Sequence, residues 1–165
     1  MKEFDFSEKS LFIEAAQRIK DYIHYTPLLS CTSIDRMLGC EILFKCENFQ
    51  KAGAFKSRGA ANAVFSLVEN GFKGSVATHS SGNHAQALSR VALHADIHAH
   101  VVMPENSLSS KINATKEYQA QITFCTPTLE AREPTLKSII AETGAVEIHP
   151  YDNREIIIGQ ATCAM

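Results

Sequence analysis

Two short segments carry residue types suited to chemistry, and in each a predicted strand gives way to a helix. The first, FKCENFQKAGAFKSRGAANAV, places Lys56 where a polar loop enters a helix. Such junctions lie at the carboxyl end of a parallel sheet, where open α/β folds bind their ligands. Helix-terminal N–H groups and partial burial lower the pKa of an amine, which makes Lys56 a candidate nucleophile. Lys45, inside a strand, and Lys51, in the loop, lack this placement, and a solvated surface position for Lys56 stays the alternative.

The second segment, VATHSSGNHAQALSRVA, turns from a strand ending at His79 through Ser80–Asn83 into a helix. Small hydroxyls and a glycine at a helix start leave several N–H groups unpaired, and such groups suit a carboxylate or phosphate. The segment contains neither a Walker A loop nor GxGxxG, which argues against nucleotide-binding functions. Ordinary helix capping by Ser and Asn is the alternative interpretation. His84 and Gln86 lie one turn inside the helix, where packing roles are common.

Together the two segments resemble the fold type II family of pyridoxal-phosphate enzymes, within it the serine racemase and serine/threonine dehydratase branch. The resemblance implies that Lys56 forms the internal aldimine with pyridoxal 5'-phosphate, and that Asn83 hydrogen-bonds the pyridoxal hydroxyl. Phe55 would lie against the pyridine ring. The loop that would bind the substrate carboxylate comprises Ser80, Ser81, Gly82, Asn83 and His84.

Ser81 bears on which reaction the resemblance implies. Many threonine dehydratases of the family have Ser-Ala-Gly-Asn-His, whereas this chain has Ser-Ser-Gly-Asn-His, as in serine racemases and some hydroxyaspartate dehydratases. Racemisation needs proton-transfer groups on both faces of a planar Cα carbanion, here Lys56 and Ser81. Dehydration needs Lys56 alone to remove the Cα proton before the β-hydroxyl leaves. We therefore expect L-serine, L-threonine or a related β-hydroxy amino acid as substrate, with the ratio of the two reactions open.

The resemblance also implies parts that the 165 residues do not contain. The glycine-rich phosphate cradle, the partner of the pyridine nitrogen and the acidic ligands of a divalent cation (Mg or Ca) would all lie downstream, so no metal site is expected in this chain. The eight glycines are dispersed. For regulatory nucleotide binding only Lys111 matches, since Cys31 and Tyr151 replace a small hydroxyl and an Asn. The complete form is expected to be a homodimer.

Short apolar strands that alternate with helices predict an α/β fold with doubly wound, mostly parallel sheets. An amphipathic first helix is expected after a capping Ser7, and a short helix ending at Gly39. Strands are expected at 42–46, 75–79, 99–103, 121–125 and 145–148, and helices at 57–70, 83–93, 109–118, 128–143 and from 154 onward. The resemblance implies the tryptophan synthase β-like form of this fold.

On the family pattern the chain divides into the start of a large cofactor-binding domain (1–74), an inserted small domain (75–152) and the first returning helix of the large domain (153–165). The apolar segment REIIIGQATCAM stops without a capping residue, which suggests a truncated chain with an uncovered face under Ile156–Ile158. A docked terminal helix is the alternative. The 165 residues alone are therefore expected to be inactive.

Composition excludes several classes of protein. Hydrophobic residues make up 45% and charged residues 21%, which is ordinary globular usage. Lys plus Arg number 16 against 18 Asp plus Glu, so nucleic acid is not expected as a partner. No apolar run approaches the roughly 18 residues of a membrane span, which favours a cytoplasmic protein without membrane contact. Five cysteines without a CxxC pair predict reduced, buried thiols.

Two rival functions remain open at this stage. One is a truncated, non-catalytic relative that acts as a binding or dimerising module. The other is an unrelated doubly wound domain that binds a small carboxylate without a cofactor, in which Lys56 would be a surface residue.

Overall fold

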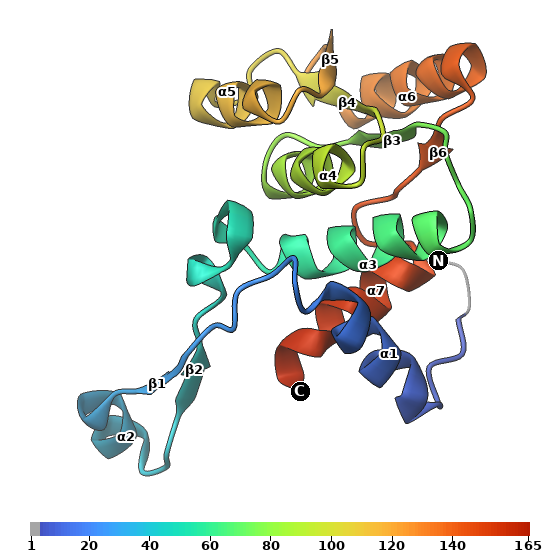
Figure 1. Ribbon diagram of the computed structural model, residues 1–165. Helices are drawn as coiled ribbons and strands as arrows, with labels where there is room; N and C mark the ends of the chain where they lie inside the picture. The colour runs from blue at the N-terminus through green and yellow to red at the C-terminus, as the bar shows by residue number, and fades with distance from the viewer. Residues whose placement is uncertain (1–3) are drawn as a thin grey trace.

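The computed structural model describes residues 4–165, which form a parallel sheet, a helical layer beneath it and a projecting arm (Figure 1). The sheet has four strands in the order β5-β4-β3-β6, all parallel. Its strands are β3 (Val76–His79), β4 (Ala99–Pro104), β5 (Gln121–Cys125) and β6 (Val146–Glu147). The expected α/β class and four of the five expected strands are confirmed.

Helices follow three of these strands and cover both faces of the sheet. They are α4 (Asn83–His94), α5 (Ser109–Glu117) and α6 (Leu129–Thr143). Alternate residues of a strand point to opposite faces. Val101 and Met103 therefore pack with residues of α4 and α5, while Ala77 and Val102 pack with residues of α6. The carboxyl ends of the strands, where ligands bind in such sheets, lead into the Ser80–Asn83 loop.

The helical layer consists of α3 (Lys56–Glu69), α7 (Arg154–Ala161) and α1 (Lys9–Ile19). Two glycines permit the close crossing of α3 and α7: a Cβ on Gly159 would lie 2.7 Å from the Cα of Gly59. Ile156 and Ile158 are buried in this layer. The uncovered face expected under Ile156–Ile158 is therefore wrong, because α3 and α1 cover it.

The arm contains β1 (Leu28–Ser30), α2 (Thr32–Leu38) and β2 (Leu43–Lys45), with β1 and β2 antiparallel. The expectation that residues 42–46 continue the parallel series is wrong, because their partner is β1, a strand too short to show a pattern in the sequence. Gly39 ends α2 at φ 70°, as expected, in a conformation that suits glycine. The arm has no core, since α2 buries no residue and Met37 is 81% exposed.

Short 3₁₀ turns complete the fold: η1 (Glu47–Phe49), η2 (Lys51–Gly53) and η3 (Thr162–Ala164). Two local expectations are wrong. Ser7 does not cap α1, because its N–H bonds the Asp5 side chain while Glu8 holds the N-cap position. The cysteines are free, as expected, but of the five only Cys125 is buried.

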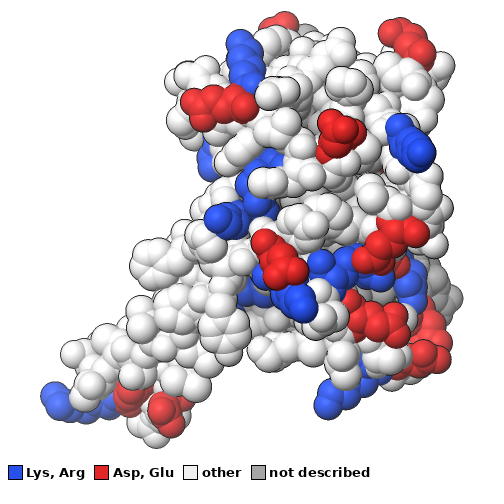
Figure 2. All heavy atoms as spheres, in the orientation of Figure 1, with Lys and Arg blue, Asp and Glu red and all other residues white. Residues whose placement is uncertain are grey.

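Charge and hydropathy in the described residues match the composition. Lys and Arg alternate with Asp and Glu over the face shown in Figure 2, while the arm is mostly uncharged except near its tip. Among residues 4–165 no helix has the length and apolar character needed to span a bilayer.

Candidate active site

Lys56 is the first residue of α3 and is partly buried. Its Nζ donates a 2.7 Å hydrogen bond to the carbonyl oxygen of Pro150 and lies 5.3 Å from the centre of the Phe55 ring. Burial lowers the pKa of the Lys56 amine, because desolvation disfavours the charged form. This is the environment in which a lysine can act as a nucleophile and a base.

The loop before Lys56 is bent sharply. Ala52 has φ 55° and Gly53 has φ 65°, so two successive residues adopt the left-handed conformation. For alanine that conformation costs about 1–2 kcal/mol, and such strain persists only where surrounding contacts hold it. Here the Ser57 hydroxyl donates to the carbonyl of Lys51 and closes the turn. The bend delivers Phe55 and Lys56 to the start of α3.

Arg58 and Gly59 of the same motif are structural. The Arg58 guanidinium makes a two-pronged contact with Glu47, with Nε–Oε2 at 2.8 Å and Nη2–Oε1 at 2.7 Å, and Thr26 donates to the same carboxylate at 2.6 Å. Burial raises the pKa of Glu47, but the hydrogen bonds from Arg58 and Thr26 outweigh it and leave the pKa below its usual value. The ion pair fixes the loop to the first turn of α3, two residues beyond Lys56.

The Ser80–Asn83 loop connects β3 to α4 and is more open. Ser81 and Asn83 are exposed, and Ser80 and Gly82 are partly buried. The Ser80 hydroxyl accepts from the Gly82 N–H at 3.3 Å, and the Ser80 N–H binds the Val102 carbonyl of the adjacent strand. Because a helix cannot satisfy its own first N–H groups, the start of α4 presents donors to an anion.

Asn83 and Lys111 lie against each other. Lys111 Nζ, from α5, donates to Asn83 Oδ1 at 2.7 Å. An amide that accepts through its oxygen keeps its NH₂ group free to donate. The Asn83 side chain therefore has a defined orientation at the mouth of the loop.

His84 has a different environment from the rest of its loop. Its ring is 2% exposed, and its Nε2 lies 3.1 Å from the carbonyl oxygen of Ile148. Burial lowers the pKa of His84 to about 4, so the ring is neutral and Nε2–H donates to that carbonyl. The ring points into the protein, and only its main-chain N–H belongs to the start of α4.

One strand-to-helix connection holds both motifs together. Residues 148–152 run from β6 to α7 and pass between α4 and α3 (Figure 1). The Ile148 carbonyl accepts from His84, and the Pro150 carbonyl accepts from Lys56. Two motifs that are about 25 residues apart in sequence are thus bound to carbonyls two residues apart, which brings Lys56 and the start of α4 to the same connection.

The comparisons with known proteins agree with this geometry. A family profile described as pyridoxal-phosphate dependent enzyme matches residues 19–165. The chain belongs to this family. It is 48% identical over 152 residues to a serine racemase of Dictyostelium discoideum, covering 92% of this chain and 47% of that protein. It is 44% identical over 152 residues to a β-hydroxyaspartate dehydratase of Paracoccus denitrificans, covering 92% and 48%.

The fold comparison supports the same family. A crystal structure of the Dictyostelium discoideum serine racemase superposes with a TM-score of 0.88 at 47% identity, covering 94% of this chain and 50% of that one. The resemblance to fold type II pyridoxal-phosphate enzymes is therefore confirmed. The chain spans about half the length of the curated relatives it matches.

The residues present fit part of the cofactor. The Lys56 amine, with its lowered pKa, suits the aldehyde of the cofactor. The Phe55 ring, 5.3 Å from that amine, suits the pyridine ring, and the oriented Asn83 amide suits the phenolic oxygen. Pyridoxal phosphate is thus the cofactor that the family and the donor set imply. The dispersed glycines include no run that could form a phosphate nest like those of other cofactor sites.

Three features were not predicted from the sequence. The role of Glu47 becomes visible only in the structure, where it pairs with Arg58. Residues 148–152 act through main-chain carbonyls, which patterns of side chains in the sequence cannot reveal. A group of His79, Glu147 and His149 also comes together, although about 70 residues separate His79 from the other two. The pairing of β3 with β6 brings these three residues close, and no local spacing in the sequence indicates it.

Proposed function

We propose that this chain carries the lysine and the carboxylate-binding loop of a pyridoxal-phosphate-dependent serine racemase that is also an L-serine (L-threonine) dehydratase. The observation that carries the proposal is the juxtaposition of Lys56 and the Ser80–Asn83 loop through residues 148–152. Both reactions are supported by the relatives, because a serine racemase and a β-hydroxyaspartate dehydratase each match over nine-tenths of this chain.

In this proposal Lys56 holds the cofactor and moves the Cα proton. When bound, pyridoxal phosphate withdraws the electron pair left on the substrate Cα. The Lys56 amine suits proton transfer because burial already lowers its pKa, so the neutral form costs less than at a surface lysine. Phe55 lies beside the amine and would cover the pyridine ring.

Ser81 is proposed as the proton-transfer group on the opposite face of Cα. Its side chain is exposed on the loop rather than buried in packing, so it is free to meet a substrate. Racemisation needs a group on each face, whereas loss of the β-hydroxyl needs only Lys56. Ser81 would therefore determine how the two reactions divide.

The substrate carboxylate is proposed to bind Ser80, Ser81, Gly82 and Asn83, together with the main-chain N–H of His84. The His84 ring is instead proposed to position Ile148, because the ring is buried and its Nε2 is hydrogen-bonded to that carbonyl. Asn83 would donate to the pyridoxal hydroxyl while Lys111 holds its oxygen. Lys111 is also proposed to contribute to regulatory nucleotide binding.

The relatives are about twice as long, and we propose that their additional length supplies the phosphate nest, any Mg or Ca ligands and a homodimer interface. The division into 1–74, 75–152 and 153–165 is proposed on the same basis. The whole enzyme's activity would then require more than these 165 residues.

The test joins residues 1–165 to the C-terminal half of the Dictyostelium discoideum serine racemase. We expect this chimera to form D-serine and pyruvate from L-serine, and residues 1–165 alone to form neither. Ser81→Ala in the chimera should remove D-serine formation and leave pyruvate formation measurable. Equal loss of both products would assign Ser81 to carboxylate binding, and an inactive, soluble, folded chimera would favour a non-catalytic binding module.

A further inference from the structure

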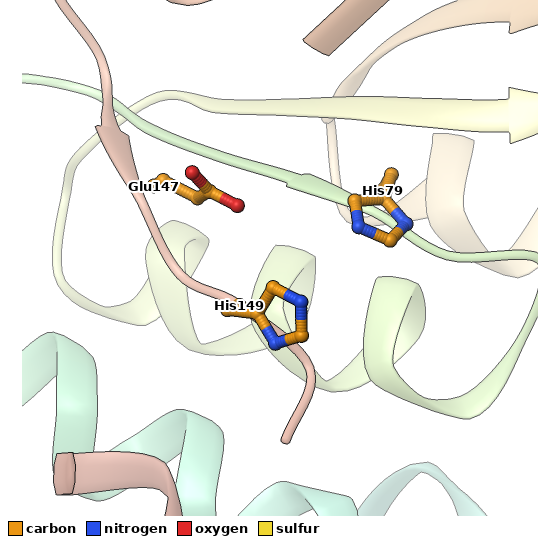
Figure 3. Close-up of side chains that lie close together, drawn as sticks. All are labelled: His79, Glu147 and His149. Carbon is orange, nitrogen blue, oxygen red and sulfur yellow. The ribbon is translucent and has the colours of Figure 1, made fainter. Parts of the chain in front are cut away.

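A second group of chemically active side chains lies beside the site, on the sheet itself. In the β3–β6 register Ala77 pairs with Glu147, and two residues further along each chain segment the rings of His79 and His149 lie 5.6 Å apart. Because alternate residues share a face, all three side chains lie on the same face of the sheet. One ligand atom from each of His79, Glu147 and His149 lies within 4.8 Å of the other two (Figure 3).

We propose that His79, Glu147 and His149 form a binding site for Zn²⁺ with one coordination position left to water. Two imidazoles and a carboxylate are a common zinc donor set, and sites with three protein ligands keep an open position. Imidazole nitrogens favour Zn²⁺ and similar transition metals over Mg²⁺ and Ca²⁺, which take oxygen ligands. The proposal does not depend on the function proposed above.

The distances and exposure allow the site to close. Tetrahedral ligands at about 2.0–2.1 Å from zinc are roughly 3.4 Å apart. The group is within about 1–1.5 Å of that spacing. Glu147 is exposed and His149 is partly buried, so both can adjust, while His79, at 8% exposure, is held by the strand. The site therefore combines a fixed ligand with two adjustable ones.

The surrounding charges favour a cation. Arg132 and Glu133, both on α6, are two further charged groups near His79. One cation and one anion offset each other, which leaves the charge of Glu147 to attract the metal. Residues 4–165 offer no other group of three His, Cys, Asp or Glu side chains this close together.

Metal binding would be coupled to the connection that holds Lys56. His149 Nδ1 accepts hydrogen bonds from the N–H groups of Asp152 at 2.8 Å and Tyr151 at 3.3 Å. A neutral imidazole that gives its Nε2 lone pair to zinc carries its proton on Nδ1, where it cannot accept. Zinc therefore releases both N–H groups, next to the Pro150 carbonyl that accepts from Lys56.

The experiment titrates Zn²⁺ into residues 1–165 against a chromophoric chelator and repeats the titration with Co²⁺. We expect one Zn²⁺ per chain and a tetrahedral Co²⁺ spectrum without sulfur-to-metal charge transfer. Glu147→Gln and His149→Asn each remove a direct ligand and should weaken Zn²⁺ binding by at least the roughly tenfold to a hundredfold that the loss of an outer-shell partner costs. The matched controls Glu117→Gln and His98→Asn change exposed residues of the same types and should leave the affinity unchanged.

A second measurement does not depend on the variants. Amide hydrogen exchange at Tyr151 and Asp152 should accelerate when Zn²⁺ binds, because His149 no longer accepts from them. The proposal is overturned if the chain binds no Zn²⁺, if both ligand variants bind as tightly as the parent, or if the Co²⁺ spectrum shows thiolate ligation by the free cysteines.

Discussion

The Lys56 junction and the Ser80–Asn83 loop, which we propose belong to one site, are held in opposite ways. Around Lys56, the Arg58–Glu47 pair is 6% and 11% exposed, and Gly59 packs directly on α7. In the loop, Ser81 and Asn83 are exposed, and the Lys111 amine supports Asn83 from α5.

The difference shows which part of the site is built before ligand binds. A nucleophile must be placed accurately, and packing by neighbours that cannot move achieves this. A loop that receives a carboxylate can stay open, because the anion itself supplies the missing hydrogen bonds. Substitutions at the junction should therefore affect folding or chemistry strongly, and substitutions in the loop should act more mildly.

Replacing the lysine should have the largest effect. Lys56→Ala in the chimera should abolish both D-serine and pyruvate formation, because Lys56 is the amine proposed to hold the cofactor and to move the Cα proton. Lys51→Ala, five residues earlier, is the matched control and should retain activity. Both products are measured from L-serine, and substantial turnover by Lys56→Ala would contradict the assignment.

Breaking the buried ion pair should come next. Arg58→Ala leaves the Glu47 carboxylate buried without its partner and should lower the free energy of unfolding by about 3–5 kcal/mol. Because the folded-state pKa of Glu47 is lowered, the pair stabilises the parent above the ordinary glutamate pKa, and this stability is lost as pH falls through the folded pKa. Urea unfolding of parent and variant between pH 7 and pH 3 measures both effects. A variant as stable as the parent at pH 7 would show that the pair does not hold the junction.

Gly159→Ala should destabilise the chain by about 1–3 kcal/mol, through overpacking of α7 against α3. The new Cβ would lie 2.7 Å from Gly59 Cα and 2.8 Å from the Arg58 carbonyl oxygen, both main-chain atoms. The direction of the stability change is informative, because replacing glycine by alanine in a helix with free space around it stabilises the protein by up to about 1 kcal/mol. Asn113→Ala, on the exposed side of α5, is the comparison. Thermal unfolding decides the sign.

The loop should respond least. Lys111→Ala removes the group that orients Asn83 and should weaken pyridoxal-phosphate binding by the chimera about fivefold to tenfold, which is about 1–1.4 kcal/mol and within the range of one typical intramolecular hydrogen bond. Lys116→Ala, exposed on the same helix, should have no effect. Cofactor affinity is read from visible absorbance. A loss as large as that from Lys56→Ala would mean that the loop is as preorganised as the junction.

Sequence patterns predicted the parts of the molecule that repeat a simple period. The helices at α3, α4 and α6 and the buried strands of the sheet follow from apolar spacing, and Gly39 marked the end of α2. Strand β1 of the arm and its antiparallel pairing with β2 were not predicted, because three-residue strands carry no period and exposed apolar residues such as Met37 look like core residues. Lys56 and Asn83 came from motifs, whereas Glu47 and the carbonyls of Ile148 and Pro150 depend on tertiary contacts that no local pattern encodes.

The most direct test of the account is to identify the lysine that reacts with the cofactor. Residues 1–165 are mixed with excess pyridoxal phosphate, reduced with borohydride, digested and mapped by mass spectrometry. The lowered pKa of Lys56 and its place at the start of α3 predict that the pyridoxyl group is found on Lys56. A label mainly on Lys45 or Lys51, or no label at all, would contradict the central claim.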